Sequence, residues 1–396
     1  MNRETNGQTF ARQNVFFDLS VRWFFTNALI ALAFLWTQNS TQALQAPEAP
    51  KADNDKEGIQ VGVDIRVELM NIIARLNGNP EYKMPNSKSP YSERVEKHFE
   101  AFKDHKAIDL FRKGRARYGW SYDAVPSLAL HLGPLPELKE RMPFDKKPAR
   151  LDQRWQNEST AEFLTALREF VAESKAEAFF AAEAGFYRSV EERMRKMVKE
   201  SNPVPWFDGF FGTKAGADYR VIPGLLCGGG NYGVGVVFLD GAPEEIRPVL
   251  GCWQWDKEGL PIFEEKTYLG TFVHELCHSY TNPLCDRHLK ELEPPIAAIF
   301  PSVAARMRRM AYGMPKTVLY ETLVRACVIR YLEDRKGKTA AAQEKSRQKA
   351  AGFAWVPGLA DLLADYARDR KTYPNLDAFA PAMAKYLEES AKNVKP

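Results

Sequence analysis

The order of apolar and polar positions predicts helices through the first half of the chain. Apolar residues recur there at intervals of three and four, which is typical of helices with one buried face. The helices predicted from this pattern cover residues 67–76, 92–102, 105–118, 122–131, 151–172 and 174–201. A strand-like alternation precedes them at residues 59–65. Residues 59–202 are therefore expected to form a helical N-terminal part.

A β-like region begins after Pro203. Residues 219–226, 231–239 and 249–255 read as strands. The first two are joined by Cys227-Gly228-Gly229-Gly230, so we expect them to pair as a hairpin with the third strand beside it. The glycine triplet lacks a following Gly-Lys-Ser/Thr and opens a strand, which favours a tight turn over a phosphate-binding loop.

The rest of the chain again has a helical pattern. Residues 271–280 form an apolar helical segment, which Asn282-Pro283 is expected to end. The further predictions are a short polar stretch at 289–293, helices at 301–312, 317–334, 359–368 and 381–391, and an exposed helix or loop at 335–350. The predicted fold class is α+β, mostly α-helical, with a small sheet before the helix at 271–280.

The N-terminus has the features of an export signal. Residues 23–36, WFFTNALIALAFLW, carry no charge but are too few to span a bilayer comfortably. Residues 1–46 are therefore interpreted as a signal peptide cleaved near Ala43 or Ala46, with an N-terminal membrane anchor as the alternative. A charged, Pro-containing linker is expected at 47–58. Either interpretation makes the protein periplasmic or extracellular.

Composition excludes some functions. The net charge of +4 is small for 396 residues, and no basic stripe with interleaved aromatic residues occurs, so nucleic acid is not expected as a partner.

Five cysteines are too few for a disulfide scaffold. Cys227 and Cys252 flank predicted strands and are the first candidate pair, while buried free thiols are an equal alternative.

The chemistry of the chain is concentrated in residues 274–278, His-Glu-Leu-Cys-His. On a helix, His274 and His278 lie four residues apart on one face and can hold one metal ion together. Glu275 is close enough to take a proton from a water bound to that metal. Cys277 is better placed to pack against neighbours than to ligate. The pattern predicts a site for one Zn²⁺ ion with Glu275 as catalytic base.

A third protein ligand is needed, because catalytic zinc sites use three ligands and leave one position for water. A histidine six residues after His278 would be residue 284, which is leucine, so the metzincin pattern is absent. Glu321 is the one carboxylate within residues 317–332, and a lone acid on so apolar a helix needs a partner. We therefore predict Glu321 as the third ligand.

Several assignments stay open at this point. Glu321 can instead form an ordinary ion pair with Arg325, or Arg325 can steer Glu321 toward the metal. The alternative third ligands are Glu291, Glu293 and His288. The donor that stabilises the oxyanion during hydrolysis can be Tyr320, Tyr312 or His288.

The segments HELCHSYTNPL and LYETLVRACVIRYLED, with several N-terminal segments and Asn231-Tyr232-Gly233, resemble a bacterial group of exported gluzincin-type metallopeptidases described as a domain of unknown function. The resemblance covers about residues 60–335. It implies a zincin-like catalytic part, residues 203–396, with zinc held by His274, His278 and Glu321 and with Glu275 as base. Many gluzincins have an aspartate four residues after the glutamate ligand, where this chain has Arg325.

The function expected from these features is zinc-dependent hydrolysis of peptide bonds. The partners would be a peptide or protein substrate, with membrane contact only through an uncleaved N-terminal segment. Zinc peptidases commonly bind substrate along a strand beside the motif helix, and the Gly-rich stretch 228–235 suits such a strand, although an ordinary buried hairpin fits equally. The alternatives are a cell-wall amidase and a non-catalytic envelope protein, but the latter has no need of Glu275.

Overall fold

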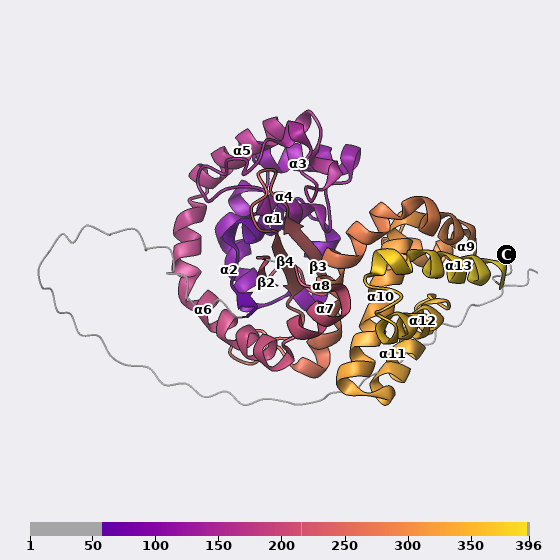
Figure 1. The fold of residues 1–396 in the computed structure, drawn as a ribbon. Helices are drawn as coiled ribbons and strands as arrows, with labels where there is room; N and C mark the ends of the chain where they lie inside the picture. Colours follow the sequence, from indigo (N-terminus) through magenta and orange to yellow (C-terminus); the bar gives the residue numbers. More distant parts are fainter. Residues whose placement is uncertain (1–57, 215, 394–396) are drawn as a thin grey trace, which may run out of the picture. The chain divides into compact units, whose positions relative to one another are not determined.

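The computed structural model describes residues 58–214 and 216–393 (Figure 1). The predicted signal peptide or anchor and nearly all of the predicted linker lie outside the described residues. Among the described helices, none is long and apolar enough to cross a membrane. The predicted α+β class is confirmed, since helices predominate and a small mixed sheet precedes the longest C-terminal helices.

The N-terminal helices follow the predicted order. They are α1 (Ile65–Leu76), α2 (Pro90–Phe99), α3 (Lys106–Tyr118), α4 (Ala124–Leu130), α5 (Ser159–Glu173) and α6 (Ala176–Ser201). Short 3-10 turns occur at Pro80–Tyr82, Pro85–Ser87, Glu100–Phe102, Phe144–Lys146 and Gln153–Trp155. The helix predicted from residue 151 begins only at Ser159, because Trp155 anchors the preceding segment by donating its indole N–H to the Ala124 carbonyl.

The sheet has four strands, β1 (Gln60–Val61), β2 (Asp218–Gly224), β3 (Tyr232–Val236) and β4 (Glu245–Gly251), in the order β1-β2-β4-β3. Strand β4 is parallel to β2 and antiparallel to β3. The predicted hairpin of residues 219–226 with 231–239 is therefore wrong, because β4 lies between these strands. All but the first residue of β4 are buried, as expected for a central strand whose two faces are both covered.

The two faces of the sheet belong to two hydrophobic cores. Ile222 and Val249 contribute to a core made with the N-terminal helices. Val221 and Leu250, which point to the other face, contribute to a core made with the C-terminal helices. Alternation of side chains along each strand explains this division. The sheet thus joins the two helical parts, and helix α8 contacts β3 and β4 (Figure 1).

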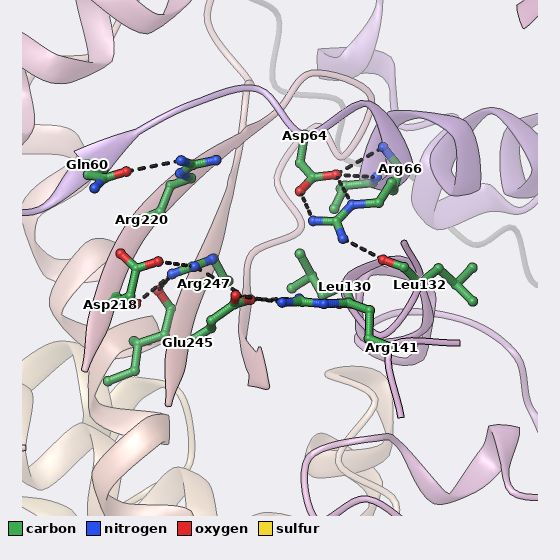
Figure 2. Close-up of polar contacts among 12 residues, drawn as sticks. Gln60, Asp64, Arg66, Leu130, Leu132, Arg141, Asp218, Arg220, Glu245 and Arg247 are labelled. Atoms are coloured by element: carbon green, nitrogen blue, oxygen red, sulfur yellow. Dashed lines mark hydrogen bonds and ion pairs between the residues drawn. The ribbon is translucent and has the colours of Figure 1, made fainter. Parts of the chain in front are cut away.

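Charged side chains reinforce this junction (Figure 2). Glu245 of β4 accepts two hydrogen bonds, of 2.7 and 2.8 Å, from the guanidinium of Arg141. Arg247, also in β4, pairs with Asp218 of β2. On the N-terminal side, Arg66 donates to the Leu132 carbonyl at 2.5 Å and pairs with Asp64. The charges therefore link the loop after α4 to the centre of the sheet.

The C-terminal part is helical. Its helices are α7 (Val204–Phe211), α8 (Glu265–Arg287), α9 (Leu289–Arg309), α10 (Pro315–Lys336), α11 (Lys338–Ala350), α12 (Val356–Arg368) and α13 (Leu376–Asn393). Helix α10 packs against α8, α9, α11 and α12. Its central position explains why its sequence is apolar on almost every face. Residues 289–293, predicted as a short polar stretch, form the beginning of α9. The buried side chains of Leu292 and Ile296 anchor this part of the helix in the core.

Helix α8 continues through Pro283, so the prediction that Asn282-Pro283 ends it is wrong. Proline lacks the N–H that would donate to the carbonyl of residue 279. Lys214 supplies the missing donor, because its Nζ lies 2.9 Å from the Ser279 carbonyl oxygen. Leu284 and Cys285, on the following turn, are buried in the core. The helix therefore extends to Arg287 and keeps Asn282 on the same face as His278.

All five cysteines are unpaired and buried. The candidate disulfide between Cys227 and Cys252 is therefore not formed, and the alternative of buried free thiols holds. Burial raises the pKa of both thiols well above the ordinary value, which keeps them protonated. Cys277 packs in the C-terminal core next to Cys327 and does not join the group of candidate ligands.

Candidate metal centre

One face of α8 carries the candidate ligands because of how closely the helix approaches the sheet. His274, His278 and Asn282 follow one another at intervals of four residues and share that face. Strand β3 crosses the helix at Gly233. A Cβ atom at this position would lie 2.6 Å from both the Glu275 carbonyl oxygen and the His278 Cβ atom. Only glycine allows this spacing, so Gly233 fixes the depth at which the motif helix lies.

The neighbouring helix α10 brings Glu321 to the two histidines. Its Oε2 atom lies 3.5 Å from His274 Nε2, and its Oε1 atom lies 3.5 Å from His278 Nε2. His274, His278 and Glu321 each offer one potential ligand atom, and these three atoms all lie within 4.8 Å of one another. The structure therefore brings together the three residues that the sequence singled out as a ligand set.

The spacing of these atoms fits a small divalent ion. With Zn–N and Zn–O bonds of 2.0–2.2 Å and tetrahedral angles, two ligand atoms on one zinc ion lie roughly 3.3–3.5 Å apart. The two His–Glu separations of 3.5 Å agree with this value. The side chains of His274 and His278 are 18% and 13% exposed, so solvent reaches the site. The donor set of two imidazoles and one carboxylate suits zinc.

The electrostatics of the site also favour a cation. Burial lowers the pKa of His278 to about 4, and His274 and Arg150 act in the same direction, so this ring is neutral at pH 7. Burial alone would raise the pKa of Glu321, but His274, Arg325 and His278 outweigh it and hold the pKa well below its ordinary value. An ionised carboxylate thus faces a neutral ring nitrogen. The carboxylate oxygen and the ring nitrogen both present lone pairs, and a bound cation would interact favourably with both.

A hydrogen bond within α8 orients one ligand. His278 Nδ1 lies 3.1 Å from Asn282 Oδ1. Because an amide oxygen only accepts, Nδ1 carries the proton and Nε2 keeps its lone pair toward Glu321. This assigns the tautomer that a metal ligand needs. Asn282 was missed at the level of sequence because the helix was expected to end there, although its position four residues after His278 was the signal.

Glu321 is held from behind by Arg325. The guanidinium donates to Glu321 Oε2 through Nε at 3.0 Å and through Nη2 at 2.8 Å. Gln348 of α11 and Tyr312 in turn accept hydrogen bonds from Arg325. The ion pair and the ligand role, which the sequence left as alternatives, are therefore both compatible with the structure: Arg325 uses one carboxylate oxygen and orients the group.

Glu275 is buried beside the three candidate ligands but is not one of them. Burial raises its pKa well above the ordinary value, and Glu321 and Asp123 add to this effect. Arg325 and the Gly233 backbone N–H act in the opposite direction. A carboxylate with a raised pKa next to the site suits a proton acceptor.

The other candidates from the sequence have different partners. His288 Nε2 lies 2.9 Å from Asp377 of α13, and the Tyr320 hydroxyl donates to Asp286 at 2.5 Å. Glu291 and Glu293 lie in α9 and do not join the group of ligand atoms. Tyr312 is the one of the three proposed oxyanion donors that shares a partner, Arg325, with Glu321.

These features define an α+β protein with a two-helix His-His-Glu site able to hold a metal ion. Residues 148–386, more than half of the chain, match the model of the family described as Domain of unknown function (DUF4932), and the chain belongs to this family. The match starts later than the resemblance expected at 60–335 and extends further, through the C-terminal helices. No curated protein and no solved structure matches the chain.

Proposed function

We propose that this protein is a zinc-dependent metallopeptidase that hydrolyses peptide bonds. The observation that carries the proposal is the convergence of His274, His278 and Glu321 with a separate buried carboxylate, Glu275, beside them. Three ligands leave a position free for water, which is the arrangement of catalytic sites. A base that does not itself bind the metal is the additional group that hydrolysis needs.

His274, His278 and Glu321 would hold the ion, and Asn282 and Arg325 would keep two of these ligands in position. A bound zinc ion supplies a Lewis acid that activates water and polarises a carbonyl group. Glu275 accepts a proton from the attacking water and delivers it to the nitrogen of the leaving amine. The products are a new carboxylate and a free amine.

The alternatives use the same ligands differently. A cell-wall amidase would attack an amide bond of peptidoglycan with the same base. A non-catalytic envelope protein would bind peptide or a partner and has no use for Glu275 near the metal. The raised pKa of this carboxyl, held in a buried position, favours a catalytic role over a purely structural site.

The proposal is tested with purified zinc-loaded protein on a casein-type substrate. Glu275→Gln is expected to keep its zinc and lose about 10²–10⁴-fold in activity, since it removes the proton acceptor. The matched control is Glu291→Gln, an exposed change in α9, which should keep full activity. Equal cleavage by wild type and Glu275→Gln would refute the assigned base.

Two further measurements separate the alternatives. Loss of casein cleavage on chelation, with recovery on adding zinc, supports the peptidase over the binding protein. Release of amino groups from peptidoglycan without casein cleavage would support the amidase.

We further propose export to the periplasm or cell exterior, with peptides or proteins as substrates. Fractionation of cells and N-terminal sequencing of the mature protein test that location.

A further inference from the structure

A cluster of charged side chains lies beside the candidate metal centre, where α8 meets β3. Arg150 Nη2 donates to the Ser279 hydroxyl at 2.8 Å, and Lys214 Nζ donates to the Ser279 carbonyl at 2.9 Å. Ser279 directly follows His278 in α8. Both cations are therefore anchored one residue beyond a candidate ligand.

Strand β3 gives the spacing between this cluster and the motif. Gly233 faces His278, and Gly235, the next residue on the same face, has Arg150 Nη2 within 3.6 Å of the position of its Cβ atom. Two residues along a strand span about 6.7 Å. Because β3 is an edge strand of the sheet, an extended peptide can pair with it and run from the motif toward Arg150.

The cluster has more positive than negative charge. Arg150 and Lys214 share one carboxylate, Glu244, whose oxygens lie 3.4 and 2.5 Å from them. The three side chains are only 14%, 24% and 18% exposed. The nearby Asp286 is already engaged by Lys316 at 2.8 Å. One positive charge is thus left without a counterion in a mostly buried place, which is unfavourable unless an anion binds.

Arg150 has unused capacity for such an anion. Its Nε atom is buried and has no hydrogen-bond partner among the described residues. Burial lowers the pKa of Arg150 and of Lys214. Glu244 partly offsets this for both groups, and Asp286 and Tyr320 also do so for Arg150. A planar guanidinium matches the two oxygens of a carboxylate better than any other side chain does.

We propose that Arg150, supported by Lys214, binds the C-terminal carboxylate of a peptide lying along β3, so that residues are removed from C-terminal ends. This inference rests on the proposed peptidase function and names its substrate class. Along β3, the residue that faces His278 (Gly233) and the residue that faces Arg150 (Gly235) are two positions apart. This spacing fits a substrate whose cleaved bond lies close to its C-terminal end. An aspartate or glutamate side chain of a substrate offers the same chemistry and is distinguished below.

The test measures binding, using the zinc-loaded Glu275→Gln protein so that peptides are not consumed. Three peptides are compared: acetyl-Ala-Ala-Phe-Leu as the free acid, the same sequence as its C-terminal amide, and the C-terminal amide of acetyl-Ala-Ala-Phe-Glu. Calorimetry is expected to show the free acid binding about 10- to 100-fold more tightly than either amide, as for a charge-assisted hydrogen-bonded pair. Adding Arg150→Met should bring the ratio close to one.

Two variants guard against misfolding and general charge effects. Arg150→Met leaves Glu244 paired with Lys214, so the fold should persist, and thermal unfolding checks this. Arg150→Lys keeps the charge without the planar fork and should retain only part of the preference. The control Arg168→Met removes an arginine of α5 that binds backbone carbonyls and should keep the full preference.

The inference is overturned if the acid and amide bind equally, if neither binds, or if the preference survives in Arg150→Met. Tight binding of the Glu-terminated amide would overturn the C-terminal assignment in favour of an acidic side chain. Hydrolysis is followed separately with wild-type protein. An Arg150-dependent preference without cleavage of any peptide would reject the peptidase while supporting the carboxylate site.

Discussion

The hydrogen bond between His278 Nδ1 and Asn282 Oδ1, 3.1 Å long, determines which ring nitrogen faces Glu321. Many metal-bound histidines donate to a carboxylate, which raises the basicity of the ring. A neutral amide positions the ring without adding negative charge. A site braced in this way should keep the metal a stronger Lewis acid than one braced by aspartate.

Asn282→Ala is expected to weaken zinc binding about 10- to 100-fold, because the ring loses its fixed orientation. Asn282→Asp should restore the affinity, since its carboxylate accepts the same hydrogen bond. Competition with a chromophoric chelator measures both. Asn393→Ala, an exposed change at the end of α13, serves as the control. An unchanged affinity in Asn282→Ala would show that the hydrogen bond does not support the ligand.

Glu68 provides a pH-dependent contribution to stability away from the site. Burial raises its pKa to about 8, although it accepts hydrogen bonds from the Tyr91 hydroxyl and the Leu225 N–H. The folded state therefore holds a proton that the unfolded state releases near pH 4.5. The stabilisation is complete below pH 4.5 and is lost as the pH rises toward about 8.

Glu68→Gln mimics the protonated carboxyl and should flatten this dependence. Between pH 5 and 8 the free energy of unfolding of the wild type should fall by up to a few kcal/mol relative to the variant. Urea unfolding at several pH values measures the difference, with the exposed Glu93→Gln as control. A constant difference between wild type and Glu68→Gln across this range would contradict a raised pKa.

At the level of single residues, sequence spacing was enough where the ligands share one turn of helix. The interval of four between His274 and His278 predicts their meeting, and the lone acid on an apolar segment pointed to Glu321. Asn282 follows His278 at the same interval of four, but no local spacing points to Arg150. Asn282 was missed because α8 was expected to end at Asn282-Pro283, and the donor that replaces the missing N–H of Pro283 comes from Lys214 in a distant segment.

At the scale of elements, the close contact between β3 and α8 sets the geometry of the site. Gly233 lies against the turn of α8 that carries Glu275 and His278. The Gly-rich stretch was expected to permit a close approach by a backbone, and in the structure the close neighbour is the motif helix. The strand thus supports the ligand face directly.

Gly233→Ala should displace this contact, because its Cβ atom would lie 2.6 Å from the Glu275 carbonyl oxygen. We expect a destabilisation of about 1–3 kcal/mol, as for an overpacked core, together with weaker zinc binding. Gly209→Ala, in α7 with open space around the added methyl, is the matched control. Full zinc affinity and wild-type stability in Gly233→Ala would show that the contact does not fix the helix.

Strand pairing illustrates what local patterns leave undetermined at this scale. Residues 219–226 and 231–239 have the alternation of strands and a glycine turn between them, which predicts a hairpin. The buried β4 pairs with both, because a strand covered on two faces is most stable at the centre of the sheet. Which strand takes that position depends on packing against both helical parts, and a local pattern does not contain this information.

At the scale of the whole molecule, the candidate metal centre is formed by two helices of the C-terminal core, and the sheet connects that core to the N-terminal one. The ligands come from α8 and α10, two helices whose apolar faces form much of this core. A bound ion would link them across their contact. Metal binding is therefore expected to stabilise the fold as a whole.

Zinc should raise the midpoint of thermal unfolding. At free zinc 1,000 times the Kd, binding adds about 4 kcal/mol, which corresponds to several degrees for a chain of this size. Calorimetry with zinc and with chelator measures the shift, and His278→Ala should show little or none. A shift of the same size in His278→Ala would place the bound zinc elsewhere.

The most direct test is the zinc content of the purified protein, measured by mass spectrometry of the metal for wild type, His278→Ala and Glu321→Ala. We expect about one tightly bound zinc per wild-type chain and little in either variant, because two protein ligands hold zinc weakly. A wild type that binds no zinc, or a Glu321→Ala variant that keeps a full equivalent at wild-type affinity, would contradict this expectation.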